Sequence, residues 1–340
     1  MSSQNQLSRY GSISRPIDVP IGAKLFLVSD SDDTTVGPSN IGNEFPVDGD
    51  GVVRVYTTIQ AAVNGATAGR GDVIAVLPGY DNTLGRADSW DKAGISVIGY
   101  SNGGGNRPII RYTGIADEVG IAANNVRVSG LRFLAAGDSV TRGVDLDSGF
   151  SGARFDNNIF DFNATTNNFR VMLRNAQARS VIENNRFLAE DTAGAGKGIE
   201  LMAGHTDFAK IHNNYFYGQF DSVGDSSVEN SGPIAFAITH DSSDTVITGM
   251  EISENTIVST DTAAALLIML TPTACTYKSA GVVRDNRFAS YDTATADTAQ
   301  VDFGTTGGFL PLGNLFISGD SDVPEEIVGR LAKFVGIQDS

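Results

Sequence analysis

One short phrase recurs six times along this chain of 340 residues, and its spacing constrains the fold more than any other feature. The phrase consists of an aliphatic residue or Phe, two further residues, Asn, one residue, and then Phe or Ile. Successive copies of the Asn are separated by 27, 29, 41, 31 and 28 residues. A phrase repeated at a nearly constant period is typical of a solenoid, in which each repeat stacks on the previous one. The copies begin at Phe155, Ile182, Ile211, Ile252, Val283 and, with a looser match, Pro311.

The phrase has the composition of two short strands joined by a tight turn. Asn tolerates the left-handed backbone conformation that such turns require, and its apolar neighbours have the spacing of inward-pointing side chains. A short alternating strand precedes each copy, as at residues 144–146, where we expect Val144 and Leu146 inside and Asp145 outside. The sequence therefore predicts an all-β fold, a parallel β-helix with internal ladders of Phe, Ile and Asn. A β-sandwich is the alternative, but it has no reason to reuse Asn and Phe in phase.

The segments outside the repeats divide the chain into four parts. The first is polar and aperiodic, and we expect it to be an arm that docks on a partner through Arg9, Tyr10 and Arg15; a disordered terminus is the alternative. The parts are an N-terminal arm (1–22), an N-terminal strand, loop and cap helix (23–70), the β-helix (71–318) and a C-terminal amphipathic helix or cap (319–340).

Helices are predicted at both ends of the β-helix. Thr57 or Thr58 is suited to cap a short helix in which Ile59, Ala62 and Val63 share a face, and such a helix would cover the first coil. At the other end, residues 324–335 place their apolar residues on one stripe, which predicts a cap on the last coil or a subunit contact.

Charge and composition limit the classes of molecule that the protein is expected to bind. The chain holds 24 Lys and Arg against 40 Asp and Glu, for a net charge of −16, which argues against nucleic acid or an anionic membrane. The single Cys275 excludes a disulfide within one chain and a Cys-based metal site. The first residues lack the pattern of a signal peptide, so we expect the protein to stay in the cytoplasm where it is made, unless it leaves as part of a particle.

Three segments near the start carry a resemblance to a known family. Residues 24–28 (Lys-Leu-Phe-Leu-Val), 55–63 (Val-Tyr-Thr-Thr-Ile-Gln-Ala-Ala-Val) and 71–79 (Gly-Asp-Val-Ile-Ala-Val-Leu-Pro-Gly) together resemble the opening of pectate-lyase-like right-handed β-helix proteins, an arrangement frequent in virion proteins of tailed bacteriophages. The resemblance covers about residues 23–318 as architecture. It implies a right-handed parallel β-helix, often trimeric and often on a virus particle. It is a poor guide to function, because the fold carries lyases, hydrolases, adhesins and inert decoration proteins.

Four outward acids are the candidates for catalysis if the protein is an enzyme. Asp145 and Glu200 share one strand ladder, and Asp156 and Glu183 share the next. Glycoside hydrolysis needs two carboxylates at a set separation, but a stacked sheet places any two outward acids near each other. The catalytic patterns of polygalacturonases and pectate lyases are missing from the sequence, so we expect solvated acids. We also expect no metal and no cofactor; the acids of residues 30–50 have the composition of a solvated turn rather than a Ca²⁺ site.

One outward column alternates Arg with other residues, each directly before a ladder Phe or Ile. Arg and Tyr are favoured in protein interfaces, so Arg132, Arg186, Tyr215 and Arg287 are predicted to form a lateral binding face. The alternative is that these residues are exposed on the strands and have no function. The column comprises Arg132, Ile159, Arg186, Tyr215, Thr256, Arg287 and Leu315.

These features favour a non-enzymatic bacteriophage virion protein. We expect a homotrimer that decorates or cements the capsid through its arm, with capsid or other virion proteins as partners. The first alternative is a tailspike-type enzyme that cleaves host polysaccharide with the four acids above. The second is a receptor-recognition protein that binds a glycan without cleaving it.

Overall fold

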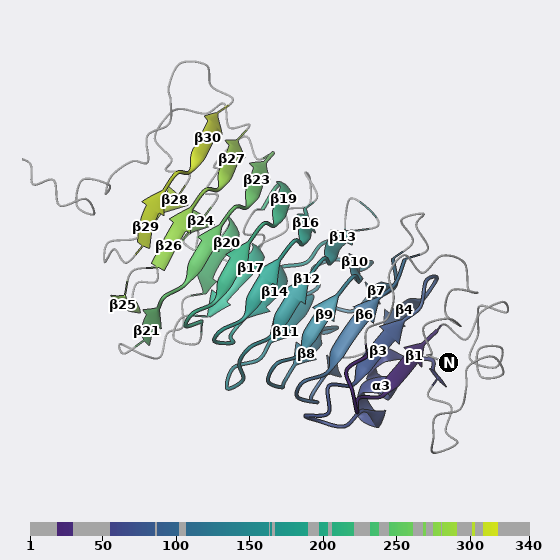
Figure 1. The fold of residues 1–340 in the computed structure, drawn as a ribbon. Helices are drawn as coiled ribbons and strands as arrows, with labels where there is room; N and C mark the ends of the chain where they lie inside the picture. The colour runs from purple at the N-terminus through teal and green to yellow at the C-terminus, as the bar shows by residue number, and fades with distance from the viewer. Residues whose placement is uncertain are drawn as a thin grey trace, which may run out of the picture.

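The protein is a right-handed parallel β-solenoid, as a computed structural model shows, which confirms the predicted fold class (Figure 1). The described residues contain no helix long and apolar enough to cross a membrane. Most of the predicted arm and the whole predicted C-terminal helix lie outside the described residues. These residues are 19–29, 55–85, 87–101, 107–162, 164, 167–189, 197–202, 206–220, 232–237, 245–260, 268–269, 275–279, 281–290, 301–302 and 309–318.

Three long parallel sheets run side by side along the solenoid, and the chain visits sheet A, sheet B and sheet C in turn (Figure 1). Sheet A contains β2 (Val55–Tyr56), β1 (Leu25–Val28), β3 (Val73–Val76), β6 (Ser96–Gly99), β9 (Arg127–Ser129), β12 (Arg154–Asp156), β15 (Val181–Glu183), β18 (Lys210–His212), β22 (Glu251–Ser253), β26 (Gly281–Arg284) and β29 (Phe309–Leu312). Sheet B contains β4 (Asp81–Leu84), β7 (Ile109–Tyr112), β10 (Arg132–Ala135), β13 (Ile159–Phe162), β16 (Arg186–Leu188), β19 (Tyr215–Gly218), β23 (Thr256–Ser259), β27 (Arg287–Ser290) and β30 (Leu315–Ser318). Sheet C contains β5 (Asp88–Ser89), β8 (Val119–Ile121), β11 (Val144–Leu146), β14 (Val171–Asn175), β17 (Lys197–Met202), β20 (Gly232–Ala237), β24 (Ile268–Met269) and β28 (Val301–Asp302). Another pair joins β21 (Thr245–Thr248) to β25 (Cys275–Ser279).

The repeated phrase forms the bend from sheet A to sheet B, and the left-handed residue lies one position earlier than predicted. Asn157, Asn184 and Asn213 have φ angles of 57°, 57° and 54°, and each directly precedes the recurring Asn. Glu254 and Asp285 occupy the same place in later coils, with φ of 58° and 55°. The prediction that the recurring Asn itself takes this conformation was wrong. The left-handed position points outward, so it accepts several residue types and leaves little trace in the sequence.

The recurring Asn residues instead form a buried ladder along the axis. The Asn185 side-chain oxygen accepts the backbone N–H of Asn158 at 2.9 Å, and its amide donates to the carbonyl of Phe155 at 2.8 Å. The same pattern repeats in the later coils up to Asn314. At the other end, the N–H of Leu131 donates to the Asn158 side chain at 3.0 Å, so the ladder starts one coil before the first Asn. Each side chain thus satisfies backbone groups that the bend removes from the sheets.

The phenylalanines of the phrase stack inside the solenoid. The rings of Phe160 and Phe187 lie 5.1 Å apart and 9° from parallel, and those of Phe187 and Phe216 lie 4.6 Å apart and 8° from parallel. Phe133 extends the stack on the other side of Phe160, with ring centroids 5.0 Å apart. All four are completely buried. The predicted ladder is therefore a continuous aromatic core beneath sheet B.

The predicted cap helix is present as α3 (Ile59–Gly65), at the N-terminal end of the solenoid (Figure 1). Thr58 is its N-cap, and its hydroxyl accepts the N–H of Ala61 at 3.1 Å. The buried face consists of the predicted Ile59, Ala62 and Val63, which join the core of the first coils. Strand β1 pairs in parallel with both β3 and β2, so these two strands extend sheet A beyond β3.

Candidate functional site

The two acids predicted on sheet C do not form a carboxylate pair. Arg174 lies between Asp145 and Glu200 in the strand register. Its Nε donates to Asp145 at 2.7 Å, and its Nη2 donates to the second oxygen of the same carboxylate. Glu200 forms an ion pair with Lys197 at 2.7 Å. Because the Arg174 guanidinium lies between them, the two carboxyl groups cannot flank the scissile bond of a substrate.

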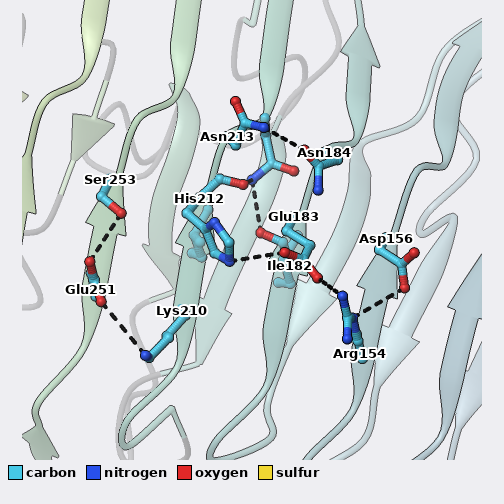
Figure 2. A network of polar contacts seen from close by, with 12 residues as sticks. Arg154, Asp156, Ile182, Glu183, Asn184, Lys210, His212, Asn213, Glu251 and Ser253 are labelled. Carbon is cyan, nitrogen blue, oxygen red and sulfur yellow. Dashed lines mark hydrogen bonds and ion pairs between the residues drawn. The ribbon is translucent and has the colours of Figure 1, made fainter.

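The two acids predicted on sheet A are adjacent in register, but cations hold both of them (Figure 2). Asp156 accepts two hydrogen bonds from Arg127, at 2.8 and 2.9 Å, and one from Ser129 at 2.8 Å. Glu183 pairs with Arg154 at 2.5 Å and faces His212 at 3.2 Å. Arg154 also approaches Asp156 at 3.4 Å and so bridges the two acids. The arrangement is a ladder of alternating charges along the outer face of sheet A.

The prediction that these acids are solvated was wrong. Asp145 and Asp156 are 2% and 1% exposed, although both point away from the core. The arginine side chains that pair with them cover them. Arg174 is the register partner of Asp145, whereas Arg127 reaches Asp156 diagonally from the neighbouring strand. Burial alone would raise the pKa of Asp156, but the hydrogen bonds from Arg127 and Ser129 outweigh it and lower the pKa below its ordinary value. An acid held ionised in this way is unsuited to donate a proton near neutral pH.

Asp156→Asn is expected to destabilise the protein by about 1.5–3 kcal/mol at about pH 7, because it weakens charge-assisted hydrogen bonds. The folded-state pKa of Asp156 is depressed, so its contribution is complete above the unfolded pKa of about 3.9 and is lost as the pH falls through the folded pKa. The difference between wild type and variant should therefore shrink below about pH 4. Urea unfolding at a series of pH values measures it.

Asp91→Asn is the matched control for this experiment. Asp91 is also ion-paired, with Lys92 at 2.9 Å, but its side chain is 51% exposed. Surface pairs of this kind contribute about 0–1 kcal/mol. If the two variants lose the same stability, the buried pairing of Asp156 does not have the importance assigned to it.

The predicted column lies on the outer face of sheet B in the predicted order. Arg132, Ile159 and Arg186 are register partners on successive strands, followed by Tyr215 and, further along, Arg287. The members differ in what they contact. Arg132 pairs with Asp161 at 2.6 Å and is partly buried, whereas Arg186 and Arg287 are exposed. The column is thus not a uniform cationic stripe.

A groove of about 390 Å³ opens on this face and is called the sheet-B groove here. Three neighbouring strands of sheet B, β13, β16 and β19, supply its lining together with Ala189, which directly follows β16. The volume lies in the range of small-molecule sites, which combine apolar walls with a few polar groups. Its lining residues are Asp161, Phe162, Arg186, Leu188, Ala189, Tyr215 and Tyr217.

Two tyrosines with parallel rings line the sheet-B groove. Tyr215 and Tyr217 point to the same side of β19, and their rings lie 6.4 Å apart and 7° from parallel. Tyr217 is 40% exposed, one of the few large apolar side chains open to solvent among the described residues. The guanidinium of Arg186 lies 6.0 Å from the centre of the Tyr215 ring, a cation–π distance. Aromatic faces beside fixed charges suit a ligand that has both apolar and polar surface.

The sequence prediction named part of this groove and missed the rest. Arg186 and Tyr215 belong to the predicted lateral face, but Asp161 and Tyr217 do not. Both lie two residues beyond the predicted column on their strands, and strand alternation could have indicated that they point to the same face. The only Trp, Trp90, is completely buried and cannot contact a ligand.

The remaining predicted binding residues cannot be placed. Arg9, Tyr10 and Arg15 of the arm lie outside the described residues. The same holds for the acidic residues 30–50. Docking through the arm therefore stays a prediction.

No protein-family model and no curated protein matches this chain. Among solved structures, a tailspike protein double mutant of E. coli bacteriophage HK620 in complex with a pentasaccharide aligns with a TM-score of 0.41 and 13% identity, over 88% of this chain and 64% of that chain. The Geobacillus virus E2 protein ORF18 aligns with a TM-score of 0.32 and 14% identity, over 76% of this chain and 58% of that chain. The chain thus spans less than two thirds of either structure. At these values the fold assignment rests on the strand pairing of this chain itself.

Proposed function

We propose that the protein is a bacteriophage virion protein that binds a cell-surface polysaccharide through the sheet-B groove without cleaving it. The observation that carries this proposal is the groove itself. Parallel tyrosine rings, an exposed guanidinium and an ion-paired carboxylate lie together on a rigid sheet. Sites built on strands hold their side chains more precisely than sites built on loops.

The chemistry of the sheet-B groove fits a sugar ring. One face of a pyranose ring carries C–H groups, which pack on the negative face of an aromatic ring, while its hydroxyl groups need hydrogen-bond partners. Tyr217 presents an exposed ring, and the phenol groups and charged side chains beside it supply donors and acceptors. A stacked sheet also continues in both directions, so a chain of sugars has a surface to follow.

Binding without cleavage is favoured because the candidate acids are engaged elsewhere. Asp145, Glu200, Asp156 and Glu183 lie on sheets C and A, whereas the groove lies on sheet B. Each of the four is ion-paired with Arg or Lys. Within the groove the carboxylate is Asp161, which is paired with Arg132. Hydrolysis by two carboxyl groups, with one protonated, therefore has no support in the described residues.

The assignment to a virion rests on the N-terminal segments that carry the family resemblance. In the structure they form β1, the segment from β2 through α3, and β3 at one end of the solenoid. Contacts with other virion proteins and a trimeric assembly are part of this proposal. Capsid decoration through the N-terminal arm is the second candidate function of this solenoid.

Tyr217→Ala is expected to weaken polysaccharide binding at least tenfold, because stacking on an exposed ring is lost while the fold is unchanged. The measurement is binding to a panel of immobilised bacterial capsular and O-antigen polysaccharides, both neutral and acidic, by biolayer interferometry. Phe208→Ala is the matched control, since Phe208 is 48% exposed but does not line the groove.

Two results would count against the proposal. If wild type binds none of the panel, or if Phe208→Ala weakens binding as much as Tyr217→Ala, the groove is not a glycan site. Release of shorter fragments from a bound polysaccharide, detected by size-exclusion chromatography, would show cleavage and favour the tailspike-type enzyme.

A further inference from the structure

The charges around the sheet-B groove are not balanced. Asp161 is neutralised by Arg132, whose Nη2 lies 2.6 Å from one carboxylate oxygen. The other oxygen accepts the backbone N–H of Phe162 at 2.9 Å. Both oxygens of Asp161 are therefore engaged, and the Arg132–Asp161 pair contributes no net charge. The remaining charged group of the lining is Arg186.

Arg186 differs from most outward arginines of the described residues. Arg111 pairs with Asp81, Arg127 with Asp156 and Arg174 with Asp145, so these guanidinium groups are each held by a carboxylate on a neighbouring strand. Arg186 has no carboxylate within ion-pair distance among the described residues, and its guanidinium lies over the ring of Tyr215. A chain with a net charge of −16 thus leaves a cation uncompensated in its groove.

The position of Arg186 suits recognition of a planar anion. A guanidinium presents parallel N–H groups that match the two oxygens of a carboxylate, and stacking on an aromatic ring leaves these edges free. Tyr215 lies beneath the guanidinium, and Tyr217 lies beside Tyr215 on the same strand face. A ligand that places its ring on Tyr217 would bring a substituent near Arg186.

We propose that the sheet-B groove recognises an acidic sugar, with the sugar carboxylate paired to Arg186 and the sugar ring packed on Tyr217. This inference rests on the proposed glycan-binding function and adds the class of sugar. The overall negative charge repels a polyanion at long range, but salt screens that repulsion over about 8–10 Å. A direct ion pair with Arg186 acts over a few ångströms, well inside the screening length, so it persists under the same conditions.

The test combines a change in the protein with a change in the sugar. Acidic polysaccharides of the panel are used before and after chemical reduction of their carboxyl groups to primary alcohols, which removes the charge and keeps the backbone. Arg186→Gln is compared with Arg287→Gln. Arg287 is an exposed arginine of the same column that lies outside the groove, so the control removes the same charge from the same face.

Arg186→Gln is expected to weaken binding of the acidic polysaccharide at least tenfold, and Arg287→Gln less than twofold. Carboxyl reduction should weaken wild-type binding to a similar extent. It should weaken binding by Arg186→Gln little further, because both changes remove the same ion pair. Equal binding of the acidic and reduced forms by wild type would overturn the inference. So would equal losses from the two arginine variants.

The two proposals fail in different ways. If neutral polysaccharides bind, and Tyr217→Ala weakens them while Arg186→Gln does not, the groove is a glycan site but not one for acidic sugars. If no polysaccharide binds, both proposals fail. If a sulfated or phosphorylated polysaccharide binds with the same dependence on Arg186 while the carboxylated ones do not, the anion is recognised but the sugar carboxylate is not the ligand.

Discussion

Asn185→Ala is expected to lower the free energy of unfolding by about 3–5 kcal/mol, because it leaves several buried polar groups unpaired at about 1–3 kcal/mol each. The side-chain oxygen of Asn185 accepts from the backbone and side-chain amides of Asn158, at 2.9 and 3.2 Å. Its own amide donates to the Phe155 carbonyl at 2.8 Å and to Asn214 at 3.0 Å. Thermal and urea unfolding followed by circular dichroism measure the loss.

Asn184→Gly is the matched control for the ladder. Asn184 is the same residue type one position earlier, but it is exposed and has a φ of 57°. Glycine adopts this conformation without strain, so we expect a change within about 0.5 kcal/mol. A loss below about 1 kcal/mol for Asn185→Ala would mean that the buried amides are not what holds the bend together.

Phe187→Ala is expected to cost a similar amount, about 3–5 kcal/mol, through loss of buried apolar surface and the cavity that remains. Phe187 is completely buried and stacks on both sides, against Phe160 and Phe216. The coils above and below are rigid, so the space cannot collapse fully. The same unfolding measurements apply.

Phe208→Ala tests whether burial, rather than ring loss, causes this effect. Phe208 is 48% exposed, and its replacement should change stability by less than about 0.5 kcal/mol. Phe187→Ala combined with Phe216→Ala should cost less than the sum of the single losses, because the rings are in contact. Strict additivity would contradict a continuous stack.

The repeat predicted the inside of the solenoid well, and the reason is physical. A ladder position must satisfy the same geometry in each coil, so Phe187 and Asn185 recur at the coil period with little freedom to vary. The outward side of the same bend has no such constraint. Glu254 takes the left-handed position that Asn184 and Asn213 take in earlier coils, and the sequence prediction therefore put that conformation one residue too late.

The outward faces were predicted less well, because a column identifies which residues point outward but not what covers them. Asp145 is followed 29 residues later by Arg174, and applying the coil period to charges would have indicated their pairing. Predicting the sheet-B groove would have required more than the strand register. Its opening depends on the sizes of Leu188, Tyr215 and Tyr217 and on the ion pair that holds Asp161.

By itself, the sequence determined the solenoid, its cap helix and the side chains that form its axis, because periodic burial is encoded in residue type and spacing. The coil period can indicate a charge pair such as Asp145 and Arg174, but only the tertiary structure decided which outward charges remain available. That outcome depends on distances of a few ångströms between side chains on neighbouring coils. It separates Arg132, held by Asp161, from Arg186, which occupies the same column two coils further on and faces the groove uncompensated.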